Sequence, residues 1–259
     1  MMTVVSRRLI CKFLLDFVYP NRCPVCGSFI KWDELLCKNC ECNLPFHKKI
    51  LCEKCGKDKC LDHDSLHFDS IYTLMRYEDI CVKAIHQLKD DRQLNFAEYS
   101  AKLLGNVLRE NGVADQADII TSVPMHRSKR RKRGYDQAQK LAHFTAMELG
   151  IREDHRLLGR TRDTAEQHTL TAAERKTHAE EIYFSLPDHA DIKGKNILLF
   201  DDVYTTGATL NVCSRLLKEM GAKKVFCAAI ATTLLDEKTQ RIKQAAFGII
   251  ISGGGLYDN

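Results

Sequence analysis

Two adjacent acids and a short run of small residues are the most informative chemistry in this sequence. Residues 197–200 are apolar and predict a buried strand, and Asp201 and Asp202 follow at its carboxyl end. Residues 209–221 predict a helix. The segment that joins them ends in small and hydroxyl-bearing residues: Thr205, Thr206, Gly207, Ala208 and Thr209. Backbone N–H groups and the helix dipole both favour a phosphate at such a helix start, so the segment predicts an anion site.

Carboxylates beside a phosphate repel it, so the two acids need another role. Accepting hydrogen bonds from vicinal sugar hydroxyls fits, since ribose 5-phosphate carries both a phosphate and a diol. The segment resembles the signature that binds 5-phosphoribosyl-1-pyrophosphate (PRPP) in type I phosphoribosyltransferases. This resemblance implies that Asp201 and Asp202 hold the ribose hydroxyls and residues 205–209 the 5-phosphate. The chain has no G-x-x-x-x-G-K-[ST] loop and no G-x-G-x-x-G fingerprint; the alternative is an ordinary strand–helix turn with two solvated acids.

Clustered cysteines predict structural zinc. Eight of the twelve cysteines lie within residues 23–60, often in C-x-x-C pairs, and such pairs in a chain of this size indicate metal ligands rather than disulfides. Two pairs separated by ten residues form the first set: Cys23, Cys26, Cys37 and Cys40. This spacing is typical of a zinc ribbon, in which two facing turns supply four thiolates in a tetrahedron.

A second set of donors follows directly. It comprises Cys52, Cys55, Cys60 and His63, which would make a Cys₃His site. The loop between its two halves is only four residues long, and Cys42 and His47 are alternative donors. Free thiols without metal are the alternative for both sets. Neither set shows an open coordination position or a nearby base, so we expect structural zinc rather than catalytic zinc.

A strongly basic run lies in the middle of the chain. Residues 127–133 carry six cations and no acid: Arg127, Lys129, Arg130, Arg131, Lys132 and Arg133. We expect a loop here, with two functional interpretations. The cations could close over the pyrophosphate of PRPP, as a flexible loop does in phosphoribosyltransferases, or contact DNA phosphates without reading sequence. The alternative is a solvated loop with incidental charge.

Several separate motifs resemble one family. They are LLDFVYPNRCPVCG near the start, HQLKD around Lys89, Ser122-Val123-Pro124 with His126, Arg133-Gly134-Tyr135-Asp136-Gln137-Ala138, and Arg160 to Thr164 with Gln167, Leu170, Glu174 and Arg175. Together they resemble the ComF family of competence proteins, which pairs a cysteine-rich zinc module with a type I phosphoribosyltransferase-like domain. The resemblance adds Lys89 to the PRPP site and implies a role in DNA uptake. Asp136 and His178 stand where the family usually has Asn, and Cys60-x-x-His63 replaces a C-x-x-C pair.

The order of predicted elements indicates an α/β domain with a parallel sheet. Apolar strands alternate with helices after about residue 68, and ligands of such sheets bind at the carboxyl ends of strands. Besides the strand and helix given above, the expected strands are residues 68–77, 117–124 (stopped by Pro124), 223–232 and 245–252, and the expected helices are residues 78–91, 96–112 and 135–149 (capped by Gly150). Three parts are expected: an amphipathic helix over residues 1–20, a zinc module over 21–66 and a phosphoribosyltransferase-like domain over 67–259.

Composition narrows the class of protein. A net charge of +5 over 259 residues and 44% hydrophobic residues are typical of a soluble globular chain, with weak support for a polyanionic partner. No apolar run is long enough to span a membrane, and residues 1–20 lack the features of a signal peptide, so we expect a cytoplasmic protein.

Three functional hypotheses follow. The first is a PRPP-binding protein of DNA uptake, which would use Mg²⁺ if it displaces pyrophosphate. The second is a binding module without turnover that engages single-stranded DNA or a competence helicase, since a fold does not imply an activity. The third, a purine-salvage transferase, leaves the cysteine-rich arm without a role. The sequence names no general base and no acceptor.

Overall fold

The structure of the chain is a computed structural model. It describes residues 20–48, 51–58, 60, 63–90, 94–160, 183–185 and 192–233, with the side chains of residues 89 and 90 left out. Residues 1–19 of the expected N-terminal helix and an apolar strand expected over 245–252 lie outside the described residues.

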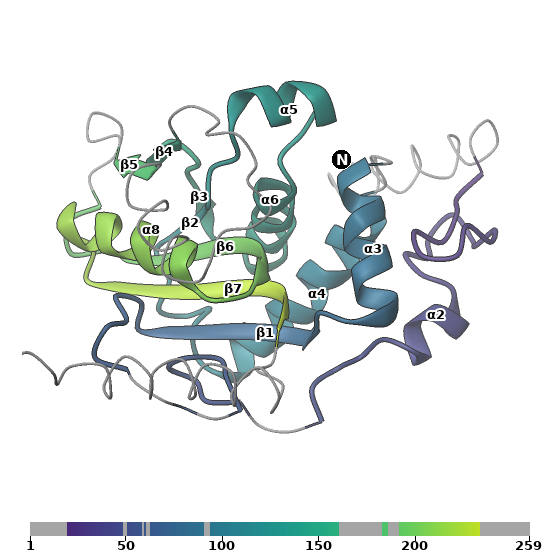
Figure 1. Cartoon of the computed structure of the whole chain (residues 1–259), viewed down its shortest axis with the longest axis horizontal. Coiled ribbons are helices and arrows are strands. Elements are labelled where there is room, and N and C mark those ends of the chain that lie inside the picture. Colours follow the sequence, from purple (N-terminus) through teal and green to yellow (C-terminus); the bar gives the residue numbers. More distant parts are fainter. Residues whose placement is uncertain are drawn as a thin grey trace, which may run out of the picture.

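Five parallel strands form the central sheet, in the spatial order β1-β7-β6-β2-β3. They are β1 (Ser70–Arg76), β2 (Ile119–Ser122), β3 (Arg152–Glu153), β6 (Asn196–Tyr204) and β7 (Lys224–Thr232). The middle strands are apolar on both faces, as expected where helices cover a parallel sheet from both sides. The predicted α/β class with a parallel sheet is therefore confirmed (Figure 1).

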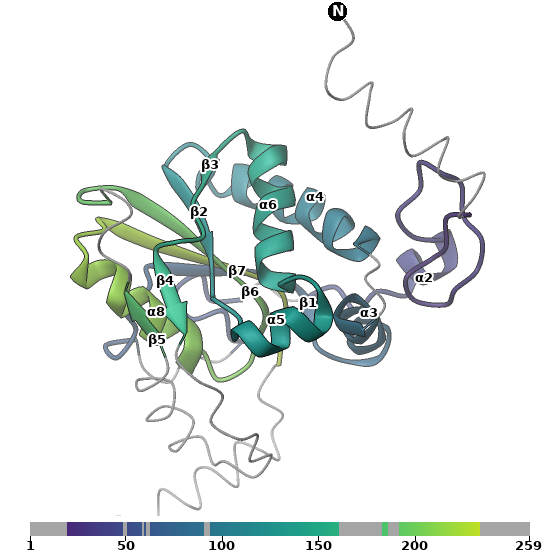
Figure 2. The same cartoon turned by 90° about the horizontal axis from the view of Figure 1, so that it is seen from above.

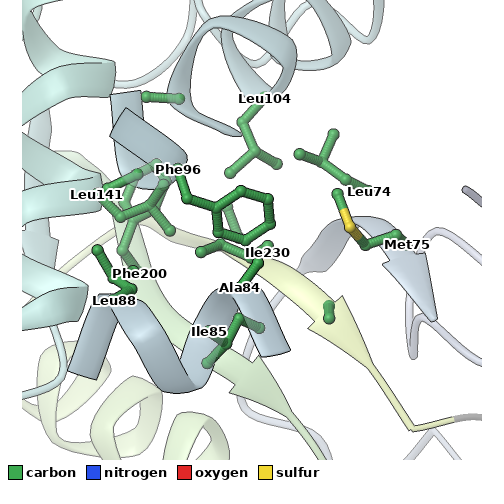
Figure 3. Close-up of a cluster of buried hydrophobic side chains, with 14 of the residues drawn as sticks. Leu74, Met75, Ala84, Ile85, Leu88, Phe96, Leu104, Leu141, Phe200 and Ile230 are labelled. Atoms are coloured by element: carbon green, nitrogen blue, oxygen red, sulfur yellow. The ribbon is translucent and has the colours of Figure 1, made fainter. Parts of the chain in front are cut away.

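Helices pack on both faces of this sheet. One face carries α4 (Asn95–Glu110) and α6 (Gln137–Leu149), with α3 (Asp79–Asp90) beside α4, and the other carries α8 (Ala208–Glu219). Side chains of α3, α4 and α6 meet those of β6 and β7 in a buried cluster, which Figure 3 shows around Phe96, Leu141 and Phe200. All of these helices except α6 begin within one residue of where the sequence predicts them.

Two smaller elements lie near the carboxyl ends of the strands. A short antiparallel hairpin consists of β4 (Leu158–Arg160) and β5 (Tyr183–Ser185), with β5 beside α8. The basic run forms helix α5 (Arg127–Arg133), so the expectation of a loop there is wrong. His126 caps its start by accepting a hydrogen bond from the Ser128 N–H, and Gly134 ends it in the left-handed conformation.

The cysteine-rich segment precedes the sheet and contains α2 (Lys38–Cys42). In two perpendicular views, α2 lies beyond α3 and α4, at the opposite end of the molecule from α8 (Figures 1 and 2). Within the described part of the chain, no helix is long and apolar enough to cross a membrane.

Candidate functional site

The acid pair lies at the carboxyl edge of the sheet. Asp201 and Asp202 belong to β6, which continues to Tyr204 because β7 runs alongside it, pairing Asp201 with Ala229 and Tyr204 with Thr232. The strand is thus longer than the sequence predicts. Gly207 follows with a φ of +81° and caps α8, so the predicted strand, loop and helix start are present in that order.

The surroundings of Asp201 and Asp136 disfavour the charged form of these carboxyl groups and raise their pKa values. Burial raises the pKa of the Asp201 carboxyl well above its ordinary value, and the neighbouring Asp202 and then Asp136 add to the rise. The Asp202 N–H donates to Asp201 Oδ1 at 2.8 Å, which opposes the shift without cancelling it. Three acids in one place create a demand for hydroxyl donors or a cation, as the diol hypothesis requires.

Asp136 is the third acid, and it is also a structural cap. It is 6% exposed, and its Oδ1 accepts the Gln139 N–H at 3.2 Å at the start of α6. Its Oδ2 accepts the Met125 N–H at 2.9 Å, which fixes the turn between β2 and α5. A carboxylate supplies two acceptor oxygens here, whereas Asn would supply one. Burial raises the pKa of Asp136, and Asp202 adds to it.

These acids share a cleft of about 260 Å³ with cations from elsewhere in the chain. Its lining includes Asp136, Asp201, Asp202 and Thr209 together with Lys129, Arg133, Arg160 and Tyr183. The Arg160 Nε atom is buried and has no hydrogen-bond partner among the residues that the structure describes. An unsatisfied buried donor of this kind costs free energy that an anionic ligand would recover.

Helix α5 divides its cations between two surfaces. Lys129 and Arg133, one turn apart, are half-buried and line the cleft with the acids. The remaining cations are exposed: Arg127, Arg130, Arg131 and Lys132. The helix therefore offers positive charge both to a ligand in the cleft and to a partner outside it. Lys89 belongs to α3, and its side chain lies outside the described residues.

The first cysteine set forms a compact cluster. The ligand atoms of Cys23, Cys26, Cys37 and Cys40 all lie within 4.8 Å of one another. Burial raises the pKa of Cys40, and the sulfur atoms of the other three raise it further. Four thiols this close cannot all ionise without a cation, and a Cys₄ donor set fits zinc.

The second set also converges, although its spacing is unusual. The ligand atoms of Cys52, Cys55, Cys60 and His63 again lie within 4.8 Å of one another. The sulfur atoms of Cys52 and Cys55 raise the pKa of Cys60, so this cluster too is short of positive charge. A Cys₃His set fits zinc. His47 is engaged elsewhere, with Nε2 at 3.0 Å from Thr73 Oγ1.

Two known protein families match parts of this chain. The model of the phosphoribosyl transferase domain matches residues 113–248, more than half of the chain. This chain belongs to the phosphoribosyl transferase family. A double zinc ribbon domain matches residues 14–71, so the cysteine clusters are those of a structural zinc module.

Two named proteins are similar to this chain over most of its length. The chain is 29% identical over 240 residues to the DNA utilization protein YhgH of Escherichia coli K12, covering 90% of this chain and all of that protein. It is 25% identical to competence protein F of Haemophilus influenzae, covering 83% of this chain and 92% of that protein. A shorter match, 37% identical over 59 residues, is to ribose-phosphate pyrophosphokinase of Pyrococcus furiosus, covering 23% and 21% of the two chains. The resemblance to the ComF family is thereby confirmed.

Several residues that line the cleft were not predicted as site residues from the sequence. Tyr183 lies in a short hairpin without a motif, and Asp136 drew notice only as a departure from the family pattern. Arg160 appeared in a family motif but was given no role. A signal existed for Arg160 and Asp136, because both fall in family motifs; Tyr183 had none.

Proposed function

We propose that this chain binds PRPP or another ribose 5-phosphate in the cleft at the ends of β2 and β6 and acts in the uptake or handling of DNA. The observation that supports it most is the shared cleft, in which the motif acids Asp201 and Asp202 lie with Lys129, Arg133 and Arg160. A diol and a diphosphate demand such a mixture of acceptors and cations. The relatives named for DNA utilization and competence support the biological setting, and we place the protein in the cytoplasm.

In this proposal the ligand lies along the edge of the sheet. Asp201 and Asp202 accept hydrogen bonds from the ribose hydroxyls, and the N–H groups of residues 205–209 hold the 5-phosphate at the start of α8. Lys129 and Arg133 then face the pyrophosphate and stabilise its charge. Lys89 of the HQLKD motif is a further candidate for that role.

Two kinds of metal belong to the proposal. Mg²⁺ prefers oxygen ligands and retains waters; Asp136, Asp201 and Asp202 would hold it, and it would supply positive charge that neutralises the pyrophosphate. The three acids of the cleft suit it, because their mutual repulsion raises the pKa of Asp201 beyond the effect of burial. Structural zinc is assigned to the two donor sets, Cys23, Cys26, Cys37 and Cys40, and Cys52, Cys55, Cys60 and His63.

If the chain is catalytic, the reaction is displacement of pyrophosphate at the anomeric carbon of the ribose. The transition state resembles an oxocarbenium ion, and the developing charge on the departing pyrophosphate falls where α5 presents its half-buried cations. The acceptor and the general base are left unassigned.

The outer face of α5 favours a second function. Arg127, Arg130, Arg131 and Lys132 are exposed, and these like charges within one short helix repel one another unless a polyanion lies beside them. A strand of DNA supplies phosphates at such spacing without requiring base readout. In this alternative the fold is a binding module for single-stranded DNA, or for a competence helicase, and no turnover occurs.

Calorimetry tests the primary proposal. The full chain is titrated with PRPP and Mg²⁺, with ribose 5-phosphate and with pyrophosphate. The double variant Asp201→Ala/Asp202→Ala should weaken both ribose phosphates about tenfold or more and leave pyrophosphate nearly unchanged. Asp115→Ala, which removes an exposed acid before β2 at the opposite edge of the sheet, is the control. If the double variant binds each of the three ligands as tightly as the wild type does, the diol assignment is refuted.

Titration with single-stranded DNA at several salt concentrations tests the second function. The outer variant Arg131→Ala/Lys132→Ala should weaken DNA of any sequence and flatten the log–log salt slope by about one per lost phosphate contact. The cleft variant Lys129→Ala/Arg133→Ala removes the same charge and should instead weaken pyrophosphate. An unchanged slope in the outer variant would place the DNA contact elsewhere.

A further inference from the structure

The second cysteine knuckle, residues 52–57, contacts the phosphate loop directly. The Lys57 ammonium donates to the Thr205 carbonyl oxygen at 2.7 Å, to the Thr233 carbonyl oxygen at 2.8 Å and to Thr232 Oγ1 at 3.2 Å. An ammonium group has three protons, and these three acceptors match them. Lys57 therefore ties the knuckle to the loop after β6 and to the end of β7 at the same time.

Tyr204 makes a second connection. It is 3% exposed, and its hydroxyl donates to the Cys55 carbonyl oxygen at 2.8 Å. Its ring lies between two glycines: an added Cβ on Gly56 would come within 3.2 Å of the ring, and one on Gly207 within 2.7 Å. Lys57 Nζ lies 4.3 Å from the centre of the same ring. One aromatic side chain thus packs against both the knuckle and the glycine that starts α8.

The segment after the knuckle makes a third connection, to α8 itself. The His67 N–H donates to Asn211 Oδ1 at 2.6 Å, and Asn211 Nδ2 donates to the Ser65 carbonyl oxygen at 2.9 Å. Asn211 lies in the first turn of α8, where its N–H bonds to the Gly207 carbonyl oxygen at 2.8 Å. The start of this helix is held from the side of the cysteine module.

From these contacts we propose that the second knuckle is a positioning element of the ribose-phosphate site, with Lys57 and Tyr204 as its positioning residues. The inference rests on the proposed function, because it concerns the same loop. A phosphate-binding loop that is already ordered pays less conformational entropy when its ligand binds. The knuckle supplies that order by fixing the Thr205 carbonyl and the Tyr204 ring, so that the N–H groups of the loop face the ligand before it arrives.

Two single substitutions test the proposal. Lys57→Ala removes the three hydrogen bonds of the ammonium, and Tyr204→Phe removes only the bond to Cys55 and keeps the ring. Lys57→Ala should weaken ribose 5-phosphate roughly tenfold or more, as expected for lost hydrogen bonds from a charged group, and Tyr204→Phe less. Lys54→Ala, a lysine of the same knuckle without a described contact to the loop, is the matched control.

Selectivity separates positioning from general destabilisation. Pyrophosphate contacts the α5 side of the cleft in the proposal, so the ratio of ribose 5-phosphate to pyrophosphate affinity should fall in Lys57→Ala and stay constant in Lys54→Ala. Hydrogen exchange gives a readout without ligand: amides of residues 204–210 should exchange about tenfold faster in Lys57→Ala, while α4 and α6 keep their protection.

The outcomes distinguish the two proposals. If wild type does not bind ribose 5-phosphate, the proposed function is wrong, and the exchange rates of residues 204–210 still decide whether the knuckle orders the loop. If Lys57→Ala leaves both the affinity ratio and these exchange rates as in Lys54→Ala, the positioning role is refuted.

Discussion

The two cysteine knuckles share one backbone design and differ in what surrounds it. In the first, the Cys23 N–H donates to the Ser28 carbonyl oxygen at 2.8 Å, and in the second the Cys52 N–H donates to the Lys57 carbonyl oxygen at 3.0 Å. Gly27 and Gly56 follow the second cysteine of each pair, with φ angles of +73° and +63°. The same C-x-x-C-G sequence therefore builds the same turn twice.

Their surroundings differ completely. An added Cβ on Gly27 would meet nothing within 4 Å, whereas one on Gly56 would meet the Ile71 side chain at 2.7 Å and the Tyr204 ring at 3.2 Å. The first ribbon instead reaches α4, where Asn95 Nδ2 donates to Asn21 Oδ1 at 2.8 Å.

The residue five positions after the first cysteine shows what this difference means. Ser28 remains within its own knuckle, with Oγ 3.0 Å from Cys26 Sγ. Lys57, at the equivalent position, reaches out of its knuckle to the Thr205 carbonyl oxygen. One copy of the repeated turn thus keeps this residue within its own knuckle, while the other uses it to contact the loop between β6 and α8.

Replacing one exposed metal ligand in each cluster should reveal the largest difference between the two knuckles. Cys26→Ser and Cys60→Ser are each expected to lose about one zinc per chain, because metal binding and local folding are one event in such modules. Cys60→Ser should also weaken ribose 5-phosphate about tenfold, and Cys26→Ser should leave that affinity intact while residues 21–48 become protease-sensitive. Metal analysis, limited proteolysis and calorimetry measure these effects. Equal loss of affinity in both variants would contradict the distinction.

Alanine substitutions at Gly27 and Gly56 should show a smaller difference between the two knuckles. Alanine with positive φ costs about 1–2 kcal/mol at either position. Gly56→Ala adds an overlap with Ile71 and Tyr204 that Gly27→Ala does not, so its free energy of unfolding should fall by about 1–3 kcal/mol more. Denaturant unfolding measures both. If the two variants are equally destabilised, the packing of the second knuckle against Tyr204 is looser than described.

The smallest expected effect concerns the charge of Asp201 in the cleft. Burial and Asp202 raise the pKa of Asp201, so the folded protein holds this proton more tightly than the unfolded chain does. The resulting stability is present at low pH and is lost as the pH rises from the ordinary Asp value of about 3.9 through the raised pKa.

Asp201→Asn cannot ionise and should therefore raise the neutral-pH Tm by about 2–4 °C, with no gain below about pH 4. The oxygen of Asn still accepts the Asp202 N–H. Asp33→Asn, at an exposed acid of the first ribbon, should leave Tm unchanged at both pH values. A neutral-pH Tm at or below that of wild type would show that the Asp201 carboxyl group does not destabilise the free protein.

The local pattern of apolar residues, Pro and Gly predicts much of the architecture. Apolar runs bounded by Pro124 and by the acid pair correctly predicted β2 and β6, and Gly150 correctly marked the end of α6. These features depend on residues within one strand or one helical turn, so periodicity reveals them. Helix α5 was mistaken for a loop because its cations repel one another, and the His126 cap and Gly134 that stabilise it were not weighed.

The sequence by itself determined the family, the parallel α/β class, the two zinc donor sets and the order of the acid pair, loop and helix start, because each depends on residue types at short spacing. Only the tertiary structure decided which distant residues meet there. Lys57 and Thr205 lie 148 positions apart, and Tyr183 reaches the cleft through a hairpin. Such contacts arise when the sheet brings the carboxyl ends of β2, β6 and β7 to one edge, and no local periodicity encodes that edge.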